Sequence, residues 1–273
     1  MKRRSLSLKA ANIVAKVIII LFSLAPIYAC LIVSLTPYSH MLTPQLVPHF
    51  LALSNYTEAF GGIVLNMLNS FTYSIATILL VMVTCIPLAY ICTRYEFKLK
   101  KYLLFGVLLT QMISGIVLLP SLYQNYNMLG LLNNRLVLIF TFAGVNMGMT
   151  IWLLIGFFKE LPYAIEEAAH IDGANFVTTL VRIVIPISVP GIAVGAVFTF
   201  INSYNEFIIP LFLIVTPEFK PLTLRLYSYL SDTTVKWNVV GAAAMIGMVP
   251  AIAIFLACQN YIIGGITTGA VKN

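Results

Sequence analysis

Six long apolar runs constrain the fold of this chain more than any other feature of its sequence. A helix needs roughly 20 mostly apolar residues to cross the hydrocarbon core of a bilayer. The runs do not alternate apolar and polar residues as barrel strands do, and backbone polar groups in lipid must be paired within the protein. We therefore predict an all-α integral membrane protein with about six transmembrane helices. The runs lie near residues 11–36, 67–93, 102–122, 136–158, 187–215 and 239–263.

Composition supports the same class. The chain is 60% hydrophobic and only 9% charged, whereas an average soluble domain is about 25% charged. A soluble fold would have too few charges to cover its surface. We expect residues 1–273 to form a single transmembrane domain without a soluble domain.

The first apolar run follows Lys2, Arg3 and Arg4, as the core of a signal peptide would. A signal-peptide core is only about 7–15 residues long and ends at a small-residue cleavage site. This run is longer, contains Lys16 near its start and continues to Leu35. We interpret it as a retained helix.

The net charge of +7 raises the alternative of a nucleic-acid partner, but the basic residues are distributed as membrane topology predicts. In a six-helix arrangement twelve of the sixteen basic residues lie on one side of the membrane, and only Arg135, Lys220, Arg225 and Lys236 lie on the other side. Because basic residues gather on the cytoplasmic side, both termini and the 94–101 and 159–186 loops are expected there. We predict a multi-pass protein of the prokaryotic cytoplasmic (inner) membrane and no nucleic-acid partner. The twelve basic residues expected on the cytoplasmic side are Lys2, Arg3, Arg4, Lys9, Lys16, Arg94, Lys98, Lys100, Lys101, Lys159, Arg182 and Lys272.

Small residues recur within the predicted spans. Gly144/Gly148 and Gly191/Gly195 are pairs four residues apart, a spacing that lets helices approach closely. All four cysteines also fall within the spans and lack metal-ligand spacing, so we interpret them as packing residues.

The cytoplasmic loop at 161–190 has the pattern of a helix, a break and a second helix. Pro162 suits a first-turn position, where its missing N–H costs little, and Gly173 supplies the break. Asp172 is expected to cap the second helix by accepting from the N–H groups near Ala174 and Asn175. Pro186 and Pro190 are expected to end or kink that helix as it enters the membrane.

The first helix of this loop has little side-chain bulk on one side. Ile165, Ala168, Ala169 and Asp172 share a face by three- and four-residue spacing, and Ala174 is also small. Such a helix suits a groove in a partner protein. From these residues alone, an ordinary interfacial loop helix remains the alternative.

A family resemblance gives this loop a more specific interpretation. Residues 167–174, Glu-Ala-Ala-His-Ile-Asp-Gly-Ala, with Pro186 twelve residues after Ala174, resemble the EAA loop of ATP-binding-cassette (ABC) importer permeases. Leu180 and Tyr204 stand where this family often has Phe and Trp. The chain as a whole resembles the carbohydrate-uptake, maltose-type permeases. The supporting segments are Ser34–Thr36, Pro48, Asn55–Tyr56, Asn69–Ser70, Ala89–Arg94, Phe97, Leu129–Leu131, Asn205–Phe207 and Gly264–Lys272.

The resemblance implies a type I ABC importer permease fold and a function in sugar or oligosaccharide import. The chain would form half of the pathway, with the 162–172 helix as the coupling helix that docks on a separate ATPase subunit. Its implied partners are a second homologous permease subunit, two ATPase subunits, an extracytoplasmic solute-binding protein and the lipid bilayer. The residues implied in ATPase coupling are Glu166, Glu167, Ala168, Ala169, Asp172, Gly173 and Ala174.

We expect no enzymatic activity in this chain. It lacks the G-x-x-x-x-G-K-[ST] phosphate loop, so ATP and Mg²⁺ are expected on the partner ATPase. No arrangement of residues suggests a catalytic or metal site, and no cofactor is expected here.

An acid within the fifth apolar run is the other candidate site. A charge at the bilayer centre costs about 2.5–3.5 kcal/mol on insertion scales, so Glu206 is expected to face a water-filled cavity or a partner. Asn202, Tyr204 and Asn205 extend the polar patch, and Asn202, Glu206 and Ile209 share a face. The patch either lines the substrate path or binds helices together within the permease pair.

Two alternatives to a sugar importer stay open at this stage. One is an importer permease of the same fold for a polyamine, an amino acid or an oxyanion. The other is a secondary transporter, for which inverted repeats and broken helices are expected, and neither is evident in the sequence.

Overall fold

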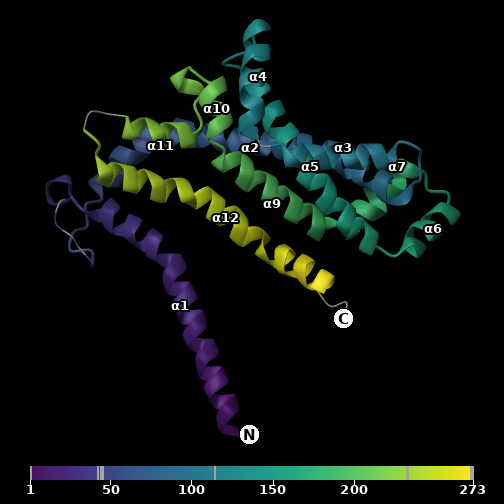
Figure 1. The fold of residues 1–273 in the computed structure, drawn as a ribbon, viewed down its shortest axis with the longest axis horizontal. Coiled ribbons are helices and arrows are strands. Elements are labelled where there is room, and N and C mark those ends of the chain that lie inside the picture. The colour runs from purple at the N-terminus through teal and green to yellow at the C-terminus, as the bar shows by residue number, and fades with distance from the viewer. Residues whose placement is uncertain (1, 42, 44–45, 114, 232–233, 271–273) are drawn as a thin grey trace. The chain divides into compact units, whose positions relative to one another are not determined.

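The computed structural model describes residues 2–41, 43, 46–113, 115–231 and 234–270, and within these the chain forms helices and loops but no strand (Figure 1). Side chains are described for 12–261 apart from the same gaps, so Lys272 and the tail side chains from Gly264 onward lie outside the described residues. The helices are α1 (Lys2–Leu35), η1 (Tyr38–His40), α2 (Ser54–Arg94), α3 (Lys100–Met112), α4 (Gly115–Met128), α5 (Arg135–Glu160), α6 (Tyr163–Ile171), α7 (Phe176–Thr179), η2 (Leu180–Val184), α8 (Ile185–Ile187), α9 (Val189–Asn205), α10 (Ile208–Leu213), η3 (Pro217–Phe219), α11 (Leu222–Leu230) and α12 (Trp237–Ala270).

The prediction of about six membrane-crossing helices is confirmed, although two of the spans are bent. Among the described residues, α1, α2, α5 and α12 are each long and apolar enough to cross a membrane. The α3–α4 pair bends by 96° and the pair formed by 176–187 and 189–205 bends by 79°. Counting each bent pair as one span gives six. The second bend lies where Pro186 and Pro190 predict a kink, whereas the α3–α4 bend was not evident in the sequence because apolar composition carries no information about direction.

The chain divides into two compact units. The first comprises Met1–Val64 and Arg225–Val249, and the second comprises Leu65–Leu224 and Pro250–Asn273. Helices α2, α11 and α12 contribute residues to both. The functional features below lie in the second unit.

In the first unit, Asn55 explains why α2 begins at Ser54 rather than near residue 67. The Asn55 amide donates to the carbonyl oxygens of Ser34 and Thr36, at 2.9 and 3.0 Å, and its Oδ1 accepts from Asn238 at 2.8 Å. The side chain is buried and ties three helices together.

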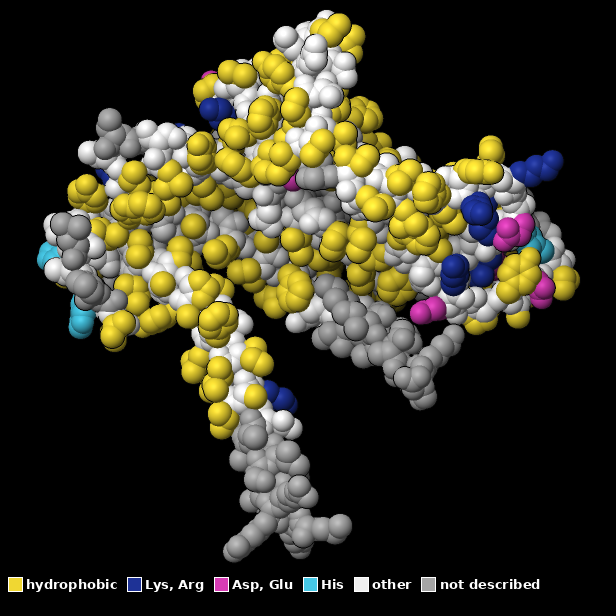
Figure 2. Space-filling view, viewed as in Figure 1, with side chains coloured by type: hydrophobic (Ala, Val, Ile, Leu, Met, Phe, Trp, Pro, Cys, Tyr) yellow, Lys and Arg dark blue, Asp and Glu magenta, His cyan; other side chains and the backbone are white. Residues whose placement is uncertain are grey.

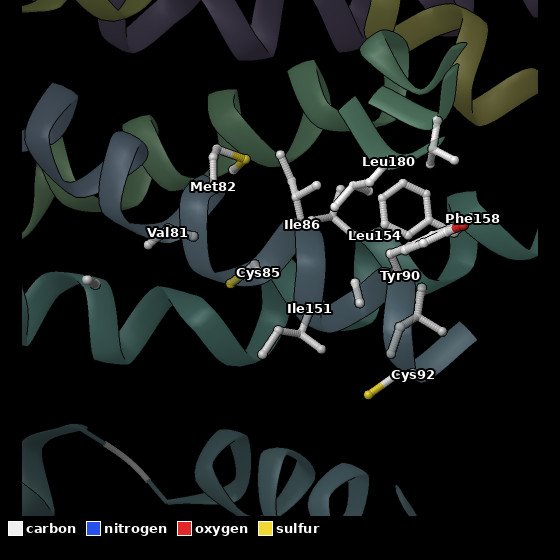
Figure 3. Packing of buried hydrophobic residues seen from close by; sticks show 14 residues of the cluster. Val81, Met82, Cys85, Ile86, Tyr90, Cys92, Ile151, Leu154, Phe158 and Leu180 are labelled. Carbon is white, nitrogen blue, oxygen red and sulfur yellow. The ribbon is translucent and has the colours of Figure 1, made fainter. Parts of the chain in front are cut away.

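The main core of the second unit lies between α2, α5 and η2. Figure 3 shows Val81, Cys85 and Ile86 of α2 packed near Ile151 and Leu154 of α5. Cys85 and Cys92 are buried in this core, as expected for packing residues. Burying such apolar side chains, at about 25 cal/mol per Å², fixes α2 against α5 and supports the loop that follows α5.

A polar face on α2 holds the segment that runs from η3 to the start of α11. Asn66, Asn69 and Tyr73 donate to main-chain carbonyls of residues 218–220 at 2.7 to 3.2 Å. Ser70 Oγ accepts from the Leu222 N–H at 2.8 Å. Residues 66, 69, 70 and 73 share one helical face by spacing, so a single stripe pairs with the backbone of this segment.

The glycine pairs differ in use. A Cβ on Gly191 would overlap the ring of Phe157, and one on Gly148 would overlap the side-chain amide of Gln111. A Cβ on Gly195 would make only ordinary contacts, and one on Gly144 would meet nothing within 4 Å. The packing role therefore applies to Gly148 and Gly191, and not to Gly144 and Gly195.

Candidate functional site

The predicted helix–break–helix loop is present, and its first helix is α6. Helix α5 ends at Glu160, Leu161 is extended, and Pro162 is the N-cap residue of the nine-residue α6. Figure 2 shows charged and histidine side chains gathered where Figure 1 places α6 and α7, and hydrophobic side chains over most of the remaining visible face. The loop is thus a polar, helical element attached to an apolar body.

The Asp-Gly-Ala sequence forms a Schellman C-cap at the end of α6. Gly173 has φ +82°, a conformation that glycine adopts without the penalty of a Cβ. Its N–H donates to His170 O at 3.0 Å, and the Ala174 N–H donates to Ala169 O at 2.9 Å. These two bonds define the motif. The cap explains physically why a glycine occurs at position 173.

The prediction that Asp172 caps the second helix is wrong. Asp172 is the C-cap residue of α6, and its N–H donates to Ala168 O at 3.1 Å. The cap of α7 is Asn175, whose Oδ1 accepts from the Thr178 N–H at 2.9 Å. The left-handed turn at Gly173 carries the chain through Ala174 before α7 starts, and this places Asp172 too early to reach the next helix.

The predicted coupling residues divide between two faces of α6. Glu167 and Ala168 are exposed, as are Asp172 and Gly173 at its end, while Ala174 is partly buried. Glu166 and Ala169 are the buried members, at 2% and 6% exposure. The outward side of α6 therefore carries Glu167 and Ala168, whereas Glu166 faces the interior of its own chain.

Glu166 is held by two residues one turn apart at the end of α2. The Tyr90 hydroxyl donates to Oε2 at 2.8 Å, and Arg94 Nε donates to Oε1 at 2.7 Å. Arg94 Nη2 lies 2.6 Å from Oε1 and also donates to Leu161 O at 3.0 Å. Both oxygens of a buried carboxylate are thereby paired, which offsets its desolvation; removing one partner of such a pair typically costs about 3–5 kcal/mol.

The second helix of the loop includes a π-helical turn before it bends. The Ile185 N–H donates to Leu180 O, five residues back, as part of the π-helix η2. Pro186 has no N–H to donate to Arg182 O and its ring would crowd that carbonyl, so a widened turn relieves the contact. The bend of 79° follows at Ser188, between Ile187 and Val189. The prediction that prolines kink this helix is confirmed.

Glu206 lies at a helix break, not within a continuous fifth helix as its position in the apolar run suggested. Helix α9 ends at Asn205, and Glu206 has extended backbone angles. Its Oε1 accepts from the N–H groups of Ile208 and Ile209, at 3.0 and 3.1 Å, and so caps α10. The backbone donors explain how the acid is accommodated at this position.

A cavity of about 380 Å³ lies beside this break. The predicted face of Asn202, Glu206 and Ile209 lines it, together with Asn146 and Ser203. Asn202 donates to Asn146 Oδ1 at 3.2 Å, and the Asn146 amide donates to Ser203 Oγ at 3.4 Å and to Phe142 O at 2.8 Å. The cavity therefore has a wall of amide, hydroxyl and carboxylate groups. Its remaining lining residues are Gln111, Phe142, Val145, Met149 and Phe198.

Two of the four predicted path residues do not line this cavity. Tyr204 is buried, at 3% exposure, and stacks on Phe200 with ring centroids 5.2 Å apart. Asn205 is exposed and donates to Ile201 O of its own helix at 2.9 Å. Asn146, which completes the polar wall, was missed because a lone Asn in α5 carries no signal in the sequence.

The fold and these two features together define a helical membrane protein with a polar loop helix and a cavity that has a polar wall. Comparison with known families identifies the kind of membrane protein. Residues 85–267 match the family described as the binding-protein-dependent transport system inner membrane component. The chain belongs to this family, whose members are permease subunits of ABC importers.

Individual relatives agree with this assignment. The chain is 31% identical to a putative ABC transporter permease protein, ORF1, of Streptomyces antibioticus, over 83% of this chain and 100% of that one. It is 29% identical to the trehalose/maltose transport system permease protein MalG of Thermococcus litoralis, over 95% of each chain. In fold it is similar to a chain of a bacterial ABC transporter that imports the acidic polysaccharide alginate, with a TM-score of 0.83 and 22% identity over 95% of this chain and 98% of that chain.

Proposed function

We propose that this chain is one permease half of an ABC importer for a sugar or oligosaccharide and that α6 couples it to a separate ATPase. The observation that carries the coupling role is the capped α6, which presents Glu167 and Ala168 outward. A short helix with small exposed residues lets a partner surface approach the backbone closely. The printed functions of the trehalose/maltose and alginate relatives support a carbohydrate as the solute.

The same proposal names the partners and the orientation. A second permease half completes the pathway, two ATPase subunits bind ATP and Mg²⁺, and an extracytoplasmic binding protein delivers the solute. The family description supports the last of these. Both termini and the α6 loop lie in the cytoplasm of a prokaryotic cell whose inner membrane holds the complex, and this chain itself holds no cofactor. The charge bias supports this orientation.

Co-purification and a single substitution test the coupling role. A tagged chain should bring down its ATPase subunits in detergent, and Glu167→Gln should lower ATP-driven uptake into proteoliposomes. Glu160→Gln is the matched control, because Glu160 is an exposed acid at the end of α5. Absence of any ATPase subunit, or equal uptake by the two variants, would contradict the assignment.

We further propose that the cavity beside Glu206 is part of the solute path. Sugars present many hydroxyl groups, which pair with the amides and carboxylate of Asn146, Asn202 and Glu206. The α10 cap makes Glu206→Gln an informative change, because a glutamine oxygen still accepts from the two backbone donors. Uptake should fall while assembly stays normal. Loss of assembly instead would favour the reading in which this patch holds the permease pair together.

The same fold with a non-sugar solute is the second candidate function, and no described contact favours it. A ligand screen on the cognate binding protein separates the two. Binding of a sugar by that protein supports the first, and binding of a polyamine, amino acid or oxyanion refutes it.

A further inference from the structure

The coupling helix has few means of holding its position. Helix α6 has nine residues, and isolated helices shorter than about 12–15 residues are marginal in water. It is bounded by an extended residue at Leu161 and by the glycine turn at 173. Its inward side chains within the described residues are Glu166 and Ala169, and an alanine methyl provides little directional restraint. The carboxylate of Glu166 therefore provides the hydrogen-bonded restraint on α6, and the Tyr163 ring adds a second contact to the same partner, with the Arg94 guanidinium 5.6 Å from the ring centroid.

The groups that hold this carboxylate also contact the elements on both sides of α6. The Tyr90 ring packs edge-on against Phe158 of α5, at 6.2 Å between centroids, and tilted against Phe176 of α7, at 5.5 Å. Arg94 holds the Leu161 carbonyl in the connection from α5. Figure 3 shows Tyr90 and Phe158 side by side at this end of the core. The last turn of α2 is thus the place where α5, α6 and α7 converge.

Arginine suits this position in a way that lysine does not. Its Nε and Nη2 both reach Glu166 Oε1, while Nη2 also serves Leu161 O. A planar guanidinium fixes these directions together, whereas an ammonium is a point charge on a flexible stem. The contact therefore sets the angle of α6 as well as its proximity to α2.

We propose that Arg94, assisted by Tyr90, is a positioning residue that transmits movement of α6 to the end of α2. The inference rests on the proposed coupling function of α6 and adds the contacts through which a movement of that helix reaches the transmembrane helix α2. It assigns Glu166 to the internal side of the coupling device, distinct from the outward Glu167.

The test is the number of solute molecules moved per ATP hydrolysed by the complete importer in proteoliposomes. Arg94→Gln and Glu166→Gln should each lower this ratio by about fivefold or more, the lower end of typical coupling effects, while ATPase subunits still co-purify. Arg94→Lys should recover only part of the loss. Glu96→Gln is the matched control, because it removes an exposed partner from the Glu96–Lys100 ion pair, and it should leave the ratio unchanged.

A second variant covers the case in which the charge-removing variants fail to assemble. Tyr90→Phe keeps the ring packing and deletes only the hydroxyl that donates to Glu166. It should assemble normally and still lower the ratio measurably. An unchanged ratio in Tyr90→Phe, or in assembled Arg94→Gln, would overturn the positioning role. If the unaltered chain recruits no ATPase subunit, the coupling function itself fails, which is a separate outcome.

Discussion

Gly173 offers a direct test of the reasoning about the coupling loop, because its replacement strains the backbone without any steric clash. Its φ is +82°, and a Cβ built on it meets nothing within 4 Å. The left-handed conformation costs an L-residue with a Cβ about 1–2 kcal/mol. At about 1.4 kcal/mol per tenfold, Gly173→Ala should lower the population of the capped loop roughly 5–30-fold relative to its alternatives.

The matched controls separate local strain from coupling. Gly173→Asn places a residue that tolerates this conformation, so it should retain most of the uptake lost in Gly173→Ala. Gly130 has φ +65° and likewise has no atom within 4 Å of a built Cβ. Gly130→Ala therefore introduces a similar backbone strain in a loop that has no proposed role in coupling.

The assay is ATP-driven uptake by the reconstituted importer, with ATP hydrolysis measured on the same vesicles. Gly173→Ala should lose uptake relative to hydrolysis, whereas Gly130→Ala should keep the ratio. Equal ratios for these two variants would refute the argument that the geometry of this cap matters for coupling. Full uptake by Gly173→Ala would refute the strain estimate itself.

Two further predictions concern stability and are measured as thermal unfolding midpoints in detergent. Asn55→Ala should destabilise the protein by about 3 kcal/mol, since it leaves buried carbonyl and amide partners unpaired; Asn205→Ala, which loses one bond within its own helix, should have little effect, and equal midpoints would contradict the Asn55 contacts. Gly191→Ala should cost about 1–3 kcal/mol by overpacking against the ring of Phe157, while Gly144→Ala, which meets nothing within 4 Å, should be neutral; a neutral Gly191→Ala would show that the ring moves aside.

The membrane class and the helix–break–helix form of the 161–190 loop could both be predicted from sequence because each depends on local composition. Long apolar runs require helices in lipid, and Gly173 within a run of helix formers requires a break. Finer features depend on tertiary partners. Glu166 and Glu167 are adjacent acids, and no periodicity in a nine-residue helix states which one faces the interior; the answer depends on Arg94, 72 residues earlier.

The breaks in the apolar runs were missed for a related reason. The 187–215 run is apolar throughout apart from a few residues, but Glu206 caps a new helix within it. The capping pattern is short and is hidden by hydrophobic neighbours. Asn146 was likewise unremarkable until the fold placed it against Asn202. The structural roles of polar residues inside apolar runs are therefore evident only from their neighbours in the folded chain.

The stripe of Asn66, Asn69, Ser70 and Tyr73 has a consequence for which side chains of the segment that it holds can be replaced. The stripe binds main-chain atoms of residues 218–222, so these bonds do not depend on the side chains of that segment. Phe219 and Leu222 have packing roles of their own, because the Arg135 guanidinium lies 4.3 Å from the Phe219 ring centroid and Leu222 is buried. Glu218 and Lys220 can therefore be exchanged for other residues, with a change of surface charge, while the path of the backbone stays the same.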